Sequence, residues 1–181
     1  MKPLNIIAST DGLRPAMNYI QLKDGFFNVT DANKLFKCPV NEIFQNDILE
    51  NLPAECYFLA NDWKNSKIEK AVFMKFTNGL IECLDKKFNT LGFLKFIDSE
   101  QFDKQVGRFP NTEAVWPNAE YKTHINEISF NPEFLEQLGR ANNKLPLYLE
   151  FFGDNKSIIV HYKDSEAKGL LMPILLNHIK N

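Results

Sequence analysis

The residue types that most often carry out catalysis or hold metals are few and scattered in this chain. Its histidines and cysteines are His124, His161, His178, Cys38, Cys56 and Cys83. The histidines have no metal-like spacing with each other or with the cysteines. Glycine-rich phosphate loops, Gly-x-Ser-x-Gly and His-Glu-x-x-His are also absent from the sequence. We therefore predict a non-catalytic protein without metal or cofactor; a small enzyme of an unrelated α+β fold stays an open alternative.

Basic side chains offer a second chemistry, the neutralisation of nucleic-acid phosphates. An excess of lysines lies at Lys64, Lys67, Lys70, Lys75, Lys86 and Lys87. Arg140 and Lys144 add two charges near the end of an expected helix, but Glu133 and Glu136 share its polar face. A solvated loop and hairpin is the favoured explanation of the lysines. As DNA contacts, Lys64, Lys67, Lys70, Lys86, Lys87, Arg140 and Lys144 are the candidates.

Composition is that of a globular chain. Of the 181 residues, 44% are hydrophobic and 24% charged, and the formal net charge is −2. A generic nucleic-acid binder would be basic, so this balance argues against tight DNA binding. The N-terminus lacks a signal-peptide core and no apolar run reaches membrane-spanning length, which is about 20 residues. We expect a cytoplasmic protein with reduced thiols and no membrane partner.

The first half predicts antiparallel strands joined by tight turns. Strands are expected at residues 17–22, 26–30, 35–40, 56–60, 71–76, 80–84 and 93–97. Asp24-Gly25 and Asn78-Gly79 are hairpin turn signals. A short helix is expected from Asn46 to Leu52, where Pro53 ends it. The polar residues 62–70 and 99–107 are expected to form loops.

The second half predicts one amphipathic helix followed by three strands. Asn131 is a good N-cap, and Pro132 suits the first helical position because its missing N–H is not needed there. The apolar residues that follow recur at helical spacing: Phe134, Leu135, Leu138 and Ala141. Strands are expected at 147–152, 157–162 and 170–176. The fold class is therefore α+β, with antiparallel sheets and two short helices on one face.

Four segments resemble bacterial DNA polymerase sliding clamps, in the order of that family. The last runs from Ile128 through the Asn131-Pro-Glu helix start to Leu171-Met-Pro-Ile. The others are Leu13-Arg-Pro-Ala-Met-Asn-Tyr-Ile-Gln-Leu, Phe27-Asn-Val-Thr-Asp-Ala-Asn-Lys-Leu and Gly107-Arg-Phe-Pro-Asn-Thr-Glu-Ala-Val-Trp-Pro-Asn. They are similar to a clamp strand, to its Thr-Asp-Gly-His-Arg-Leu turn and to its Gly-Arg-(Phe/Tyr)-Pro-Asp domain junction.

The resemblance implies a DNA-clamp-like fold in a shortened chain. It would join a clamp's middle domain, without its first helix, to the last half of the third domain. We expect a β-rich unit with one short helix at residues 1–106 and a β-α-β-β-β unit at 107–181; one continuous domain is the alternative. The chain departs from the family at Ala32, Asn33 and Lys34, where clamps have Gly, His and Arg, and at Leu175, where they have a basic residue.

A peptide-binding pocket is also implied by the resemblance. Carried over to matching positions, it comprises Thr30, Ala32, Asn33, Lys34, Leu35, Pro117, Leu171, Met172, Pro173 and Ile174. Apolar pockets of this kind take aliphatic and aromatic anchors of linear peptides, and Met adapts to several of them. The alternative is that residues 170–176 form only a core strand.

The function that follows is a sliding-clamp-like, non-catalytic accessory protein of DNA replication or repair. Its expected partners are linear peptide motifs of polymerase or repair proteins, with weak DNA contact. The alternative is a clamp-fold interaction module that does not encircle DNA. Because ring-lining basic charge is missing, we expect a monomer or dimer rather than a closed ring.

Overall fold

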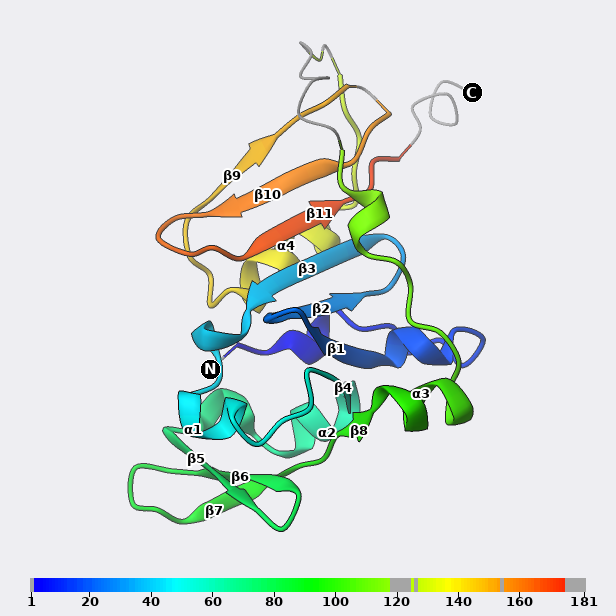
Figure 1. Cartoon of the computed structure of the whole chain (residues 1–181). Coiled ribbons are helices and arrows are strands. Elements are labelled where there is room, and N and C mark those ends of the chain that lie inside the picture. The colour runs from blue at the N-terminus through cyan, green and yellow to red at the C-terminus, as the bar shows by residue number, and fades with distance from the viewer. Residues whose placement is uncertain (1, 118–124, 126, 154, 175–181) are drawn as a thin grey trace.

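A computed structural model describes residues 2–117, 125, 127–153 and 155–174 of the chain (Figure 1). Its strands are β1 Tyr19–Lys23, β2 Phe26–Thr30, β3 Lys34–Pro39, β4 Glu55–Leu59, β5 Phe73–Thr77, β6 Leu80–Leu84, β7 Thr90–Leu94, β8 Ile97–Asp98, β9 Leu147–Glu150, β10 Ile158–Tyr162 and β11 Lys168–Leu171. Its α-helices are α1 Asn46–Leu49, α2 Ala60–Asn65, α3 Ser99–Gln105 and α4 Pro132–Ala141. Short 3₁₀ turns are η1 Leu4–Ile6, η2 Pro15–Asn18, η3 Val40–Glu42, η4 Ile68–Lys70 and η5 Glu113–Val115.

Two antiparallel sheets form the frame. The larger has the order β8-β4-β1-β2-β3-β11-β10-β9, and the smaller has the order β5-β6-β7. Strands β3 and β11, far apart in the sequence, pair in the middle of the larger sheet, with Leu35 opposite Leu170 and Lys34 opposite Leu171. The expected α+β class with antiparallel sheets is confirmed, and the larger sheet runs without a break from the first half of the chain to the second.

Both expected hairpin turns are confirmed by their backbone. Asp24 and Gly25 have φ of 50° and 79°, and Asn78 and Gly79 have φ of 50° and 75°. Two-residue turns of this kind need positive φ at both central positions, which Asn, Asp and Gly tolerate best. The turns place β1 against β2 and β5 against β6.

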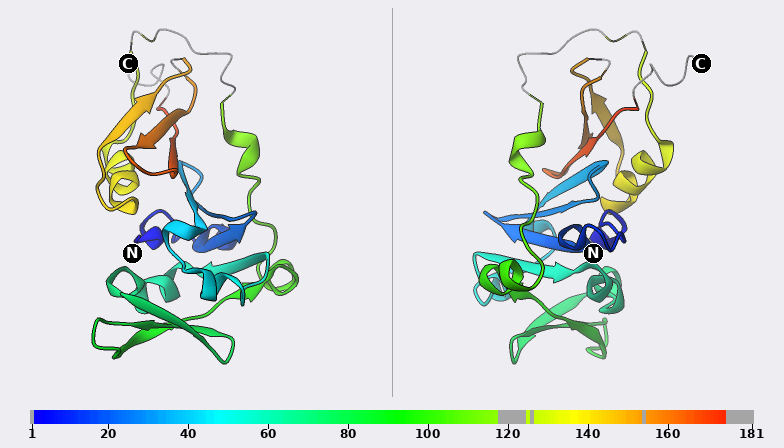
Figure 2. Two further views of the ribbon diagram at one scale, coloured as in Figure 1. Left: turned by 60° about the vertical axis from the view of Figure 1, so that its left-hand side comes forward. Right: turned by 90° about the vertical axis from the view of Figure 1, so that its right-hand side faces the viewer.

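Helices α2 and α4 lie on the same face of the larger sheet (Figure 2). On that face the strands present alternate apolar side chains, including Phe27, Val29 and Phe36, to one buried core. The predicted α4 forms as expected, because the Asn131 side chain accepts a hydrogen bond from the Glu133 N–H at 2.9 Å and Pro132 opens the first turn.

Two stretches predicted as loops are helical instead. Within residues 62–70, the stretch 62–65 belongs to α2 and 68–70 to η4, and Trp63 and Ile68 are almost fully buried. Residues 99–105 form α3, capped by Asp98, whose side chain accepts from the Gln101 N–H at 2.8 Å. One or two apolar side chains in each stretch are too few to show a helical period, yet they suffice once a sheet is there to receive them.

The remaining differences concern the ends of elements. Helix α1 stops at Leu49 rather than Leu52. Strand β11 stops at Leu171, and beyond it a single bridge joins Ile174 to Ser129. The strand predicted for 170–176 is therefore too long at its described end, and its residues 175 and 176 lie outside the described part of the chain.

The first prediction tests α2. Trp63 packs edge-on against Phe27 and Phe58, with ring centroids 5.3 and 5.6 Å apart. Trp63→Ala should lower the free energy of unfolding by about 3–5 kcal/mol, because truncating a buried aromatic leaves a cavity. Urea denaturation measures this, and Lys64→Ala on the exposed side of the same helix should change it by less than about 0.5 kcal/mol. Equal small effects would show that α2 is not packed.

A buried polar network ties the N-terminus to the second half of the chain. Lys2 is 5% exposed, and its ammonium donates to the side chains of Glu42 and Asn142. The Glu42 carboxylate also accepts from the Ser165 hydroxyl at 2.9 Å and the Glu166 N–H at 3.1 Å. Burial alone would raise the pKa of Glu42, but the hydrogen bonds from Lys2 and Ser165 outweigh it and hold this pKa below its usual value.

The network makes stability depend on pH. A lowered carboxyl pKa stabilises the fold above the ordinary glutamate pKa of about 4.3, and the contribution disappears as pH falls through the folded-state pKa. Glu42→Gln should therefore unfold at lower urea than the wild type at pH 7, and the gap should close as pH falls through the lowered folded-state pKa of Glu42. Glu166→Gln, at an exposed neighbour, is the control. A gap that persists unchanged at low pH would contradict a charged Glu42.

Candidate functional site

The turn between β2 and β3 is held by its own side chains. The Thr30 hydroxyl donates to the Lys34 carbonyl at 2.7 Å and accepts from the Ala32 N–H at 3.1 Å. Asp31 Oδ1 accepts from the N–H groups of Asn33 and Lys34 at 2.9 and 3.0 Å. These bonds keep the backbone of Ala32 at φ 76°, a left-handed conformation that residues other than Gly rarely adopt. The turn is a rigid corner beside the β3–β11 pairing.

A largely apolar cavity of about 220 Å³ opens beside this turn. Its lining residues come from η2, the turn, β3, the segment after α3, and β11: Met17, Thr30, Ala32, Lys34, Leu35, Pro110, Asn111, Thr112, Val115, Leu170 and Met172. We call it the apolar pocket. Its mouth is marked by Met172 and Val115, which are 43% and 49% exposed.

Sheet register brings the apolar wall together. Leu35 and Leu170 are direct cross-strand partners. The Met172 N–H donates to the Asn33 carbonyl at 2.9 Å and so continues the ladder past the end of β11. Because strand side chains alternate, Leu170 and Met172 share one side of the sheet and Leu171 faces the other.

The structure gathers only some of the residues implied by the resemblance. Those that line the apolar pocket are Thr30, Ala32, Lys34, Leu35 and Met172. Those outside its lining are Asn33, Pro117, Leu171, Pro173 and Ile174. Leu171 is fully buried in the core on the opposite face. The Lys34 ammonium also turns to that face, where it pairs with Asp31 and lies 4.7 Å from the centre of the Phe134 ring.

Several lining residues were not foreseen. All of them lie within the segments that resemble clamps, and strand alternation from Met172 points to Leu170. Pro110, Asn111, Thr112 and Val115 reach the pocket because the chain crosses the sheet after α3 (Figure 2). No local pattern specifies that crossing.

The candidate DNA contacts are spread over several elements. Lys64 lies on α2, and Lys86 and Lys87 lie in the β6–β7 turn. Lys67 directly precedes η4, and Lys70 is its last residue. Arg140 and Lys144 lie at the end of α4, and Arg140 Nη1 is 3.9 Å from Glu136 Oε1. All seven side chains are exposed. The helices on the core-covering face therefore carry acidic residues beside their basic ones.

The histidine and cysteine side chains of the described residues are engaged in packing and hydrogen bonding. His161 Nε2 lies 2.7 Å from Glu150 Oε2 and its ring stacks on Tyr148, while His124 and His178 lie outside the described residues. Burial raises the pKa of the Cys38 and Cys56 thiols to about 12, so they stay protonated.

Among the described residues, no three or more His, Cys, Asp or Glu side chains gather as a metal site would need. No helix in that part of the chain has the length and apolar character needed to cross a bilayer.

Comparison with known proteins agrees with this architecture. The DNA polymerase sliding clamp of Pseudomonas aeruginosa superimposes with a TM-score of 0.56 at 13% identity, over 97% of this chain and 65% of the clamp. The Bacillus subtilis clamp superimposes with a TM-score of 0.59 at 14% identity, over 94% of this chain and 60% of the clamp. The Thermotoga maritima DNA polymerase III β subunit superimposes with a TM-score of 0.60 at 12% identity, over 96% of this chain and 63% of that subunit.

These similarities are structural, since no protein-family model matches the chain and no curated protein sequence does. The chain spans between 60% and 65% of the length of these three clamps. At 12–14% identity, the superpositions show similarity of fold alone. Over most of its length, this chain has the α+β fold of the bacterial DNA polymerase III β sliding clamps.

Proposed function

We propose that this chain is a clamp-fold, non-catalytic protein that binds short linear peptides of partner proteins in the apolar pocket. The observation that carries the proposal is the cavity of about 220 Å³ where the Thr30–Lys34 turn, β11 and the segment after α3 meet. Two of its apolar side chains, Met172 and Val115, remain substantially exposed. An apolar cavity with exposed apolar side chains at its mouth suits one or two aliphatic or aromatic side chains of a peptide.

The rigidity of the turn supports this function. Four hydrogen bonds within residues 30–34 hold the polar side of the pocket before any ligand arrives. A preformed site loses less conformational entropy on binding. Met172, with three rotatable bonds and a polarisable sulfur, can adapt to different apolar anchors. The pocket therefore suits a family of related peptides.

A role as an accessory of DNA replication or repair is the broader form of the proposal. It is supported by the likeness to sliding clamps over most of this chain. A protein that brings peptide-bearing enzymes together needs no catalytic residues of its own. The partners on this proposal are polymerase or repair proteins that carry short apolar motifs.

A second form of the proposal, an interaction module that does not encircle DNA, is favoured by the charges of the helices. Helix α2 carries Asp62 and Lys64, and α4 carries Glu133, Glu136 and Arg140. Sliding on DNA needs a cationic surface toward the phosphates. Neither helix presents one, so we propose a monomer or dimer with weak DNA contact.

The next prediction concerns Met172. Met172→Ala should weaken binding of an anchor peptide, defined as the tightest binder among short synthetic peptides carrying Leu, Met and Phe, by about 1–3 kcal/mol. Because Met172 is 43% exposed, its truncation should change the melting temperature little. Fluorescence anisotropy gives the affinity, and calorimetry gives the melting curve.

Ile174→Ala is the matched control. Ile174 is also 43% exposed and lies two residues further on, outside the pocket lining. Its truncation should leave peptide affinity unchanged. Equal losses in both variants, or no binding of any peptide to the wild type, would contradict the proposed pocket.

DNA binding yields a further prediction. A duplex should bind weakly at low salt and negligibly at physiological salt, since each phosphate contact releases counterions. Replacing Lys64, Lys67, Lys70, Lys86 and Lys87 by Glu should abolish the residual binding in a low-salt anisotropy titration. Arg140→Glu with Lys144→Glu should leave it in place. Tight binding by the wild type, or loss only in the α4 variant, would show that the helices contact DNA.

A further inference from the structure

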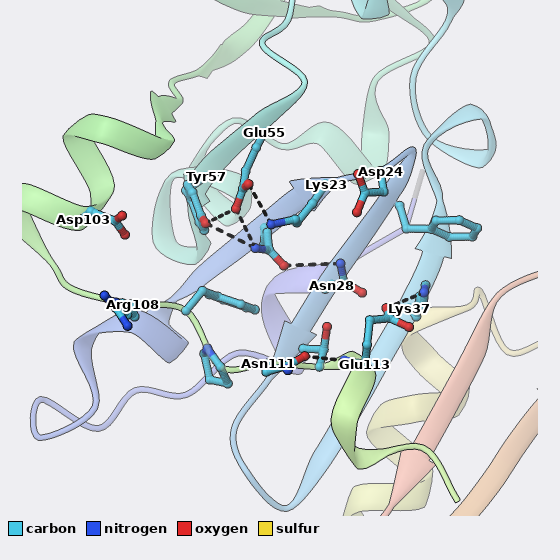
Figure 3. A pocket seen from close by; sticks show the side chains of 15 residues that line it. Lys23, Asp24, Asn28, Lys37, Glu55, Tyr57, Asp103, Arg108, Asn111 and Glu113 are labelled. Atoms are coloured by element: carbon cyan, nitrogen blue, oxygen red, sulfur yellow. Dashed lines mark hydrogen bonds and ion pairs between the residues drawn. The ribbon is translucent and has the colours of Figure 1, made fainter. Parts of the chain in front are cut away.

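A second, polar cavity lies on the outer face of the larger sheet. It has a volume of about 630 Å³ and lies between β1–β4 and residues 108–113 (Figure 3). Its floor includes Gln21, Asn28 and Tyr57, which are only 4–6% exposed. We call it the amide cavity. Polar side chains this deeply buried need hydrogen-bond partners, so each of their atoms can be accounted for.

The accounting starts at Glu55. Its carboxylate accepts from the Tyr57 hydroxyl, from Gln21 Nε2 at 3.0 Å and from Lys23 Nζ at 2.9 Å. Burial alone would raise the pKa of Glu55, but these hydrogen bonds and the Lys23 charge keep it below its usual value, so the group is an anion at neutral pH. An anionic carboxylate only accepts, and Gln21 must therefore present its nitrogen to Glu55.

The orientation of Gln21 then determines that of Asn28. With its nitrogen on Glu55, Gln21 presents Oε1 to Asn28, whose Nδ2 donates to it at 3.4 Å. Rotating the Asn28 amide would place its oxygen against the Gln21 oxygen, which removes the bond and brings two acceptors together. Asn28 therefore keeps its nitrogen on Gln21 and its oxygen on the other side.

This series of hydrogen bonds, from Glu55 through Gln21 to Asn28, ends at an acceptor without a donor. Asn28 Oδ1 is buried and has no hydrogen-bond partner among the described residues. The Asn28 side chain points into the amide cavity in the close view (Figure 3). A buried carbonyl oxygen left unpaired is unfavourable, because the hydrogen bonds it would make to water are not replaced. A ligand that brings an N–H or O–H to this point would recover that loss.

The charges around the cavity favour a cationic donor. Lys23 pairs with Glu55, and Lys37 pairs with Glu113 at 2.6 Å, so these two cations are neutralised locally. Lining residues with no ion pair in the described part of the chain are Asp24, Asp103 and Arg108. Their sum is one negative charge. An incoming anion would meet both this charge and the Asn28 acceptor, whereas an ammonium or guanidinium satisfies both.

The amide cavity adjoins the apolar pocket. Pro110, Asn111 and Thr112 line both hollows, so this stretch of backbone separates them. A polypeptide with an apolar side chain in one hollow can place a neighbouring side chain in the other by passing Asn111, which is exposed. The two cavities together form one extended surface.

We propose that the amide cavity is a second subsite for the partner polypeptide, and that it takes a basic side chain whose N–H groups donate to Asn28 Oδ1. The ligand is thus a peptide with an apolar anchor and, a few residues away, an arginine or lysine. This inference rests on the proposed function for its link to the apolar pocket. Recognition of the basic group by the amide cavity rests on the Asn28 geometry and on the charges that line this cavity.

The first test uses the anchor peptide extended through a Gly-Ser spacer by Arg, norleucine or Glu. Isothermal titration should show the Arg peptide binding roughly tenfold more tightly than the norleucine peptide, a typical effect of one charged hydrogen bond, and the Glu peptide binding more weakly. Asn28→Leu, of similar size and without the acceptor, should remove the Arg advantage. Asn155→Leu, at an exposed loop position, should preserve it. An Arg advantage that survives Asn28→Leu would overturn the proposal.

The second test needs neither variant nor peptide anchor. Acetyl-arginine amide at millimolar concentration should shift the side-chain amide NMR signals of Asn28 and Gln21 in the wild type, and acetyl-glutamate amide should not. If no anchor peptide binds but arginine amide shifts Asn28, the proposed function fails and the basic subsite stands. If the anchor peptide binds but the arginine probe leaves Asn28 unchanged, or the glutamate probe shifts it instead, the subsite fails and the proposed function stands.

Discussion

The pairing of β3 with β11 is the contact on which the arrangement of this molecule depends. It joins strands separated by more than a hundred residues into one sheet, with Leu35 opposite Leu170. The same register places Met172 over the Thr30–Lys34 turn and delivers Leu171 to the core. Without it, the apolar pocket would lose one wall and α4 would lose the strands that it covers. Hydrogen bonds of a sheet ladder thus determine which side chains can meet a ligand.

The two faces of the larger sheet have opposite chemistry. One face is apolar and is closed by α2 and α4 over a core containing Phe27, Phe36 and Trp63. The other carries Gln21, Asn28 and Tyr57, together with the two cavities. Buried amides there are tied to an anionic Glu55, so their donors and acceptors have a defined direction. On the proposed function this defined direction would let the outer face discriminate between ligands, whereas the helical face has little of the positive charge that DNA requires.

Local signals were reliable where a residue's own chemistry decides the backbone. Asn131 and Pro132 begin α4 because a cap and a ring without N–H suit that position, and Asn78-Gly79 makes a turn because both residues accept positive φ. Helices α2 and α3 were predicted as loops. Each helix is held by one or two apolar side chains, such as Trp63 and Phe102, that pack against strands distant in the sequence. Tertiary packing overrode weak local preference in both.

Residue types and short-range spacing were enough to predict the antiparallel α+β class, the turns and the cap of α4, while the segments that line the apolar pocket were implied by the resemblance to sliding clamps. The direction in which each side chain faces depends instead on the pairing of distant strands. Leu171 and the Lys34 ammonium turn toward the α4 face, and Leu170 toward the pocket, because sheet register sets the face of each residue. The free acceptor of Asn28 likewise depends on other strands, because Glu55 on β4 orients the Gln21 amide on β1, and Gln21 in turn orients Asn28 on β2. Such contacts join residues far apart in the chain, and no local pattern encodes them.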